Sequence, residues 1–164
     1  MERLLSQLKA SYPQLKFTAG KGFVWSPETG EVFYDEKRTG KRARWSLLHE
    51  TGHALLGHKS YNADYELIRL EVEAWERAKE LAAQLGITIN EEHIQDCLDT
   101  YRDWLYKRSI CPQCGTKSIQ QNDYAHYRCH NCHTAWRVTP SRFARAYRRS
   151  KNVPQSSLVF HLEN

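Results

Sequence analysis

The stretch Trp45–Gly57, WSLLHETGHALLG, constrains the arrangement of the rest of the chain. Its two histidines, His49 and His53, are four positions apart and share one face if the segment is helical. Apolar residues precede and follow them, which is typical of a helix packed into a core. A buried pair of imidazoles needs a polar partner or a ligand. The stretch therefore predicts a buried helix over residues 42–57 whose histidines share a ligand.

The same five positions also carry a group able to move a proton. In the pattern His-Glu-x-x-His on a helix, the two histidines bind zinc and the glutamate is a general base. Zinc with three protein ligands keeps a position for water and lowers the pKa of that water towards about 7. We therefore expect His49 and His53 to be zinc ligands. Glu50 is the expected catalytic residue, which accepts a proton as a peptide bond is hydrolysed.

A third ligand is expected from the next helix, which the apolar periodicity predicts over residues 65–85. The core-facing stripe consists of Leu67, Ile68, Val72, Ala74, Trp75, Ala78, Leu81, Ala82 and Leu85. Glu71 is the one carboxylate within that stripe, whereas Glu73 falls on the opposite face. A carboxylate on a buried face costs several kcal/mol unless it is paired or bound to metal. Glu71 is therefore the predicted third ligand, and a salt-bridged core glutamate is the alternative.

These positions together resemble a known family of enzymes. The pattern that carries the resemblance is His49-Glu50-x-Gly52-His53-Ala-Leu-Leu-Gly-His58, followed by Glu71-x-x-Ala74. It is similar to the ImmA/IrrE family of gluzincin-like metallopeptidases over roughly residues 20–86. The resemblance implies that the two histidines and the second glutamate hold zinc, and that Glu50 is catalytic. It also implies substrates such as repressors of mobile elements or of stress regulons. The family usually shows Asn or Asp where this chain has Trp75.

A second metal site is predicted further along the chain. Two Cys-x-x-Cys pairs, separated by 14 residues, are formed by Cys111, Cys114, Cys129 and Cys132. Four thiolates suit a closed, tetrahedral, structural zinc site. The spacing predicts a zinc ribbon that depends on its metal, because about thirty residues cannot bury much core. Two redox-active cysteine pairs are the alternative.

Charge is distributed unevenly along the sequence. Residues 1–106 carry 14 Lys and Arg against 17 Asp and Glu, whereas residues 107–152 carry 10 Lys and Arg against one Asp. The arginines and aromatic residues of the basic segment are Arg128, Arg137, Arg142, Arg145, Arg148, Arg149, Tyr124, Tyr127, Trp136 and Tyr147. Arginines can bind phosphates and aromatic rings can stack on bases, so the segment predicts a nucleic-acid partner. A basic module that orients the enzyme or binds another protein is the alternative.

The remaining patterns predict an α+β protein in which three or four helices accompany a β-hairpin or small sheet. Helices are expected over residues 2–11, 42–57, 65–85 and 91–107, and a hairpin over 22–34. The expected domains are a zincin-like metallopeptidase domain over 1–107, the zinc ribbon over 108–140, and a basic helix with a flexible tail over 141–164. The basic helix itself is expected over 141–150.

The bulk composition bears on location. The sequence has no apolar run long enough to span a bilayer, so no membrane partner is expected. Residues 1–16 have scattered charges and lack the apolar segment of a secretory signal. The expected location is the cytoplasm.

The function predicted from the sequence is that of a zinc-dependent endopeptidase. It would bind one catalytic and one structural zinc ion, and the ribbon would recruit its protein or peptide substrate. One alternative is a nucleic-acid- or protein-binding regulator that keeps a catalytically weak protease fold. Another is a SprT-like protease acting on DNA-bound proteins. That family takes its third ligand from a downstream histidine, and no residue here fits that role well.

Overall fold

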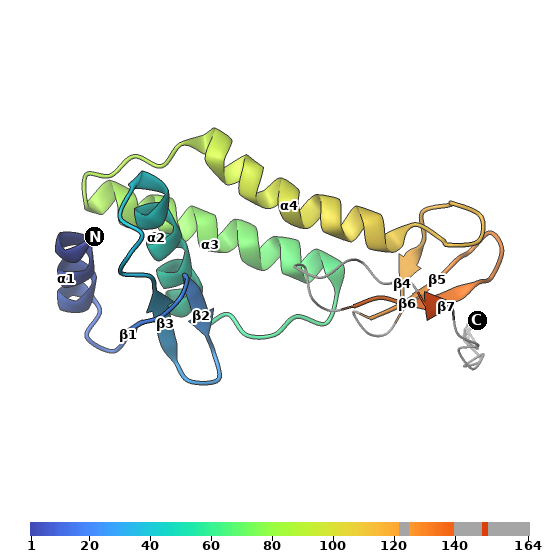
Figure 1. The fold of residues 1–164 in the computed structure, drawn as a ribbon, viewed down its shortest axis with the longest axis horizontal. Helices are drawn as coiled ribbons and strands as arrows, with labels where there is room; N and C mark the ends of the chain where they lie inside the picture. The colour runs from blue at the N-terminus through green and yellow to red at the C-terminus, as the bar shows by residue number, and fades with distance from the viewer. Residues whose placement is uncertain (122–124, 140–148, 151–164) are drawn as a thin grey trace, which may run out of the picture. The chain divides into compact units, whose positions relative to one another are not determined.

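The computed structural model describes residues 1–121, 125–139 and 149–150, which form an α+β protein with four helices and seven short strands (Figure 1). The chain divides into two compact units, which are Met1–Arg102 and Asp103–Asn164. The first unit contains α1 (Glu2–Ser11), β1 (Lys16–Ala19), β2 (Val24–Ser26), β3 (Glu31–Tyr34), α2 (Lys41–Leu56) and α3 (Asp64–Gln84). The helix α4 (Glu91–Ser109) contributes to both units.

A three-stranded sheet forms one layer of the first unit. Its strand order is β1-β3-β2, with β1 parallel and β2 antiparallel to β3. The predicted hairpin over 22–34 is confirmed by the pairing of β2 with β3. The strand β1 was not predicted, because only Phe17 is buried among its four residues and so it shows no alternating apolar pattern.

The helix α2 matches the prediction over 42–57 to within one residue at each end. It ends because Gly57 takes a left-handed conformation, with φ of +64°, which a residue without Cβ adopts at little cost. The backbone N–H of Gly57 then donates to the carbonyl of Ala54, and that of His58 donates to the carbonyl of His53. This reversal brings His58 back towards the last turn of the helix.

The helices α2 and α3 pack closely because one position between them has no side chain. A Cβ atom on Gly52 would lie 2.6 Å from the carbonyl oxygen of Ala74. Real Cβ atoms do not approach a backbone oxygen that closely, so only glycine permits this crossing. Helix α2 also packs against β2 and β3, so it lies between the sheet and α3 (Figure 1).

The other helix predictions agree with the structure near their ends. At the start of α3, the Glu66 carboxylate accepts hydrogen bonds from the backbone N–H groups of Asn62 and Ala63. At the start of α4, the Asn90 side chain accepts one from the backbone N–H of Glu92, as its capping position predicted. The helix α4 continues to Ser109, two residues beyond the predicted end.

The second unit is built on an antiparallel sheet. Its strands, in the order β4-β5-β6-β7, are β4 (Ile119–Gln120), β5 (His126–Arg128), β6 (Ala135–Arg137) and β7 (Arg149–Ser150). The fully buried Arg108 of α4 lies with its guanidinium 4.3 Å from the ring of Trp104 and 5.5 Å from the ring of Tyr127. The Trp136 indole donates to the carbonyl of Arg108. The end of α4 therefore belongs to the core of this unit.

The predicted basic helix over 141–150 is wrong at its last two residues. Arg149 and Ser150 form β7 and pair with β6. Residues 141–148 lie outside the described part of the chain, as does the tail over 151–164.

A membrane-spanning segment was not expected, and the described ranges contain no helix that combines the length and apolar character needed to cross a bilayer.

Candidate metal centres

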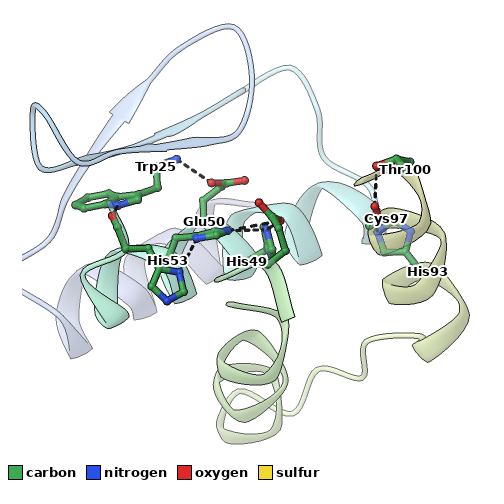
Figure 2. Close-up of polar contacts among 9 residues, drawn as sticks. Trp25, His49, Glu50, His53, His93, Cys97 and Thr100 are labelled. Atoms are coloured by element: carbon green, nitrogen blue, oxygen red, sulfur yellow. Dashed lines mark hydrogen bonds and ion pairs between the residues drawn. The ribbon is translucent and has the colours of Figure 1, made fainter. Parts of the chain in front are cut away.

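The structure brings His49, His53 and Glu71 together, as the sequence predicted. The two histidines project from consecutive turns of α2 (Figure 2), and Glu71 belongs to α3. The Nε2 atom of His49 lies 3.0 Å from Nε2 of His53 and 3.2 Å from Oε2 of Glu71. The remaining separation, from Nε2 of His53 to Oε2 of Glu71, is 3.8 Å. Three potential ligand atoms thus converge on one point.

These separations fit a zinc ion. Zinc–nitrogen and zinc–oxygen bonds of about 2.0–2.2 Å place two ligands of a tetrahedral ion roughly 3.3–3.6 Å apart. The three measured separations bracket that range. The donor set of two imidazoles and one carboxylate is also one that zinc takes in catalytic sites, where a further position stays open.

Glu71 is buried, as its place on the apolar stripe predicted. Its side chain is 9% exposed, and those of His49 and His53 are 7% and 12% exposed. Burial alone raises the pKa of the Glu71 carboxyl, but the hydrogen bonds and charges of the two histidines outweigh it and lower the pKa to about 2. The carboxylate is therefore ionised at neutral pH, as a metal ligand has to be. Glu73, by contrast, is half exposed.

Glu50 lies beside the three converging atoms and is held by the sheet. Its Oε2 atom accepts a hydrogen bond of 2.8 Å from the backbone N–H of Trp25 in β2 (Figure 2). Trp25 pairs with Val32 of β3, so an N–H that reaches Glu50 points to the outer side of β2. One carboxylate oxygen is thus anchored to the edge of the sheet. No residue pattern could predict this contact, because a backbone atom makes it.

The two histidines are supported differently. The ring of His49 lies against the indole of the buried Trp75, with centroids 4.2 Å apart and planes tilted by 34°. Within the described ranges, neither Nδ1 of His49 nor Nε1 of Trp75 has a hydrogen-bond partner. Trp75 therefore supports His49 through an aromatic face.

His53 has a polar partner that the sequence analysis missed. Its Nδ1 atom lies 2.8 Å from Nδ1 of His58, and Nε2 of His58 lies 3.3 Å from a carboxylate oxygen of Glu73. Burial, and then the nearby His53, lower the pKa of His58, while Glu73 opposes that shift. The left-handed turn at Gly57 explains how His58 reaches His53, five positions before it in the sequence.

The four cysteines form a second cluster in the other unit. The Sγ atoms of Cys111 and Cys132 are 3.6 Å apart, and those of Cys114 and Cys129 are 3.5 Å apart. All four sulfur atoms lie within 4.8 Å of one another. Zinc–sulfur bonds of about 2.3 Å place tetrahedral ligands roughly 3.8 Å apart, so the cluster fits a four-thiolate site.

Two similar turns hold these thiols. The segments 111–116 and 129–134 share the pattern Cys-x-x-Cys-x-Thr. In both, the backbone N–H of the first cysteine donates a hydrogen bond to the carbonyl of the threonine. The carbonyl of the first cysteine accepts one from the backbone N–H of the residue after the second cysteine. The residues that supply those N–H groups, Gly115 and His133, both have positive φ. This repeat of structure places the two cysteine pairs opposite each other.

The predicted stacking surface for bases is wrong for two of its aromatic residues. Tyr127 and Trp136 are 1% and 0% exposed, and their rings stack on each other inside the unit. They are needed there because this small unit has few other apolar side chains to bury. Arg128 and Arg137 lie on the opposite face of the sheet, since they alternate with these two residues along β5 and β6. Tyr124 and Tyr147 lie outside the described residues.

Comparison of the sequence with protein-family models and with curated proteins, and of the fold with solved structures, gives no match in any of the three.

Proposed function

We propose that the first unit is a zinc-dependent endopeptidase of the zincin type, similar to the ImmA/IrrE family. One observation carries the proposal. His49, His53 and Glu71 converge at zinc-binding separations, and Glu50 follows His49 on α2 with one oxygen anchored to a sheet edge. Helix α2, the glutamate of α3 and the neighbouring sheet are the parts from which a zincin site is built.

The residues have separate roles in this proposal. His49, His53 and Glu71 hold the ion, which supplies Lewis-acid chemistry by polarising the substrate carbonyl and lowering the pKa of a bound water. Glu50 accepts the proton of the attacking water and delivers it to the leaving amine. The hydrogen bond from Trp25 occupies Oε2, fixes the carboxylate rotamer, and leaves Oε1 for proton transfer.

The outer edge of β2 is the proposed binding line for a peptide. The strand has β3 on one side, and its Trp25 N–H points out of the other side towards Glu50. An extended chain added at this edge would pass the proposed general base. Val24, on the same strand, is 51% exposed and offers an apolar contact to such a chain. The proposed substrate is therefore an extended protein segment, such as the exposed part of a repressor.

The decisive experiment combines metal content with peptide cleavage. Purified protein is expected to hold about two zinc ions per chain, one in each cluster. Glu50→Gln should retain both ions, because Glu50 is not a ligand, and should slow cleavage of an unfolded protein such as casein by about 10²–10⁴-fold. Glu71→Ala should lose one ion and all cleavage.

The matched control is Glu76→Gln, which changes an exposed carboxylate of α3 that pairs with Lys79. It should leave the zinc content at two ions per chain. Equal cleavage by the wild type and by Glu50→Gln would reject the proposed mechanism. Retention of both ions by Glu71→Ala would reject the third ligand.

We further propose that the second unit is a zinc ribbon whose open sheet face binds an anionic partner. Arg128 and Arg137 lie on that face together with His126, away from the buried rings. Among the described residues, the aromatic side chains predicted for stacking, Tyr127 and Trp136, are buried, so phosphate contacts are the proposed source of affinity for nucleic acid. Binding to single-stranded DNA should therefore weaken steeply with salt, and Arg128→Gln with Arg137→Gln should reduce the salt slope by about two. Salt-independent binding would exclude this role.

A further inference from the structure

We propose that His58 is a positioning residue for the metal ligand His53. It accepts a hydrogen bond from the Nδ1–H of His53 and donates one from its own Nε2–H to Glu73. The inference rests on the proposed metal site and concerns the hydrogen-bond partner of one of its ligands, His53. His58 lies outside the His-Glu-x-x-His pattern and touches none of the three converging atoms through its own ring nitrogens.

His58 is fixed from three directions. It is 7% exposed, and its backbone N–H donates to the carbonyl of His53 in α2. Its own carbonyl accepts a 2.7 Å hydrogen bond from the indole of Trp25 in β2. Its ring bridges Nδ1 of His53, at 2.8 Å, and the carboxylate of Glu73 in α3, at 3.3 Å. Every polar group of this residue is therefore engaged. The backbone contacts hold its main chain, and the two ring contacts fix the plane of the imidazole.

These contacts allow one arrangement of protons when a cation is bound. Nε2 of His53 faces His49 and Glu71, so its lone pair must be free to bind the ion. The proton of His53 then sits on Nδ1, where its nearest partner is Nδ1 of His58. His58 must accept that proton's hydrogen bond, so its own proton sits on Nε2 and points to Glu73. A carboxylate at the end of such a chain fixes the tautomer of the ligand and raises its basicity.

The other histidine serves as an internal comparison. In the described part of the chain, Nδ1 of His49 has no hydrogen-bond partner and its ring rests on Trp75. Orientation of the metal-binding nitrogen by a hydrogen bond is therefore concentrated on His53. Changes at His58 should then affect His53 more than His49.

The test uses the full chain and three variants at comparable sites. His58→Ala removes the acceptor, whereas His58→Asn keeps an acceptor oxygen at the position of Nδ1. His93→Ala is the matched control, because His93 is partly buried near the site and contacts the rings of Trp45 and Trp75 but neither ligand nitrogen of α2. Zinc is titrated against a chelator of known affinity. Binding is followed by the imidazole ¹⁵N signals of His49 and His53. Because the four-cysteine site contains neither residue, zinc binding there does not contribute to this readout.

The expected result distinguishes a positioning role of His58 from a role in packing alone. His58→Ala should weaken zinc binding by about 10–100-fold, as is usual when such a partner is lost, and His58→Asn should recover most of that loss. With zinc bound, the wild type should show a slowly exchanging, hydrogen-bonded Nδ1–H on His53, and His58→Ala should lose this protected signal. His93→Ala should bind zinc as the wild type does.

Three results would overturn the inference. Wild-type affinity in a folded His58→Ala variant would show that His58 does not support the ligand. An equal loss in His58→Asn and His58→Ala would show a packing role only. A wild-type spectrum with the proton of His53 on Nε2 would contradict the arrangement itself. If instead the wild type gives no zinc-dependent change at His49 or His53, the metal site fails and the proposed function fails with it.

Discussion

The two candidate metal centres differ in what surrounds them. In the first unit, the ligands stand on two helices that share a large apolar core, with 14 buried hydrophobic residues in its cluster. In the second unit, the buried cluster among the described residues has five members, and two of them are the cysteines Cys111 and Cys129. The first site is therefore mounted on a fold that other forces hold together. The second site supplies a large share of the core it sits in.

This contrast has a thermodynamic meaning. A fold with its own core can exist without metal, and its site can keep an open coordination position for chemistry. A unit whose described residues bury few side chains needs the metal as part of its folding free energy. Removing each ion should therefore have opposite structural consequences.

The largest expected effect is the loss of the second unit in Cys111→Ser. Without one of four thiolates, the site should release its ion, and the unit should unfold while the first unit stays folded. Hydrogen exchange should show lost protection over residues 110–139 and unchanged protection over 41–84. The control is Cys97→Ser, which changes a cysteine outside the cluster. Continued protection of the second unit in Cys111→Ser would break the comparison, because it would show a core that does not need metal.

A smaller effect is expected where the two ligand-bearing helices cross. In Gly52→Val, the new Cβ would lie 2.6 Å from the carbonyl oxygen of Ala74, so α2 and α3 must separate. Overpacking of this kind should lower the free energy of unfolding of the first unit by about 2–3 kcal/mol. Urea denaturation followed by the helix signal measures it. Gly22→Val, at a position with no atom within 4 Å of the built Cβ, is the control and should change it by under about 1 kcal/mol. A stable Gly52→Val that still binds zinc would contradict the close crossing.

The smallest expected effect on stability comes from the ligand Glu71. Glu71→Gln keeps an oxygen that accepts a hydrogen bond from His49, so metal-free protein should lose only about 0.5–1.5 kcal/mol of stability. The same variant should lose one zinc ion per chain. Metal analysis and denaturation of the chelator-treated protein test both halves of this expectation. Collapse of the first unit in Glu71→Gln would show that its core depends on the site after all.

The apolar periodicity of the sequence predicted most of the buried positions on the helices. The stripe argument placed Glu71 among buried residues because a helix repeats its faces every 3.6 residues, and the structure shows the side chain 9% exposed. The helix ends near Gly57 and Gly86 followed from the freedom of glycine at positive φ. The antiparallel hairpin was visible because its two strands are close in sequence.

Other features depend on contacts between distant segments and could not be predicted in this way. The strands β1 and β3 pair in parallel although β2 lies between them in the sequence, so no short turn connects them and no turn signal predicts the pairing. The contact between His58 and His53 needs the reversal at Gly57, which a helical projection does not describe. The burial of Trp136 follows from the packing of Arg108 and Tyr127, so composition alone suggested an exposed ring where the structure has a buried one.

The hydrogen bond from Trp25 to Glu50 has a consequence for how the site could vary. A main-chain amide makes that bond, so every amino acid except proline can provide it at position 25. What the site requires is the alignment of Trp25 opposite Val32, since a slip of one residue would turn the amide towards β3. Evolution could therefore replace the indole freely as far as Glu50 is concerned, while a single insertion or deletion in the hairpin would uncouple the proposed base from the sheet.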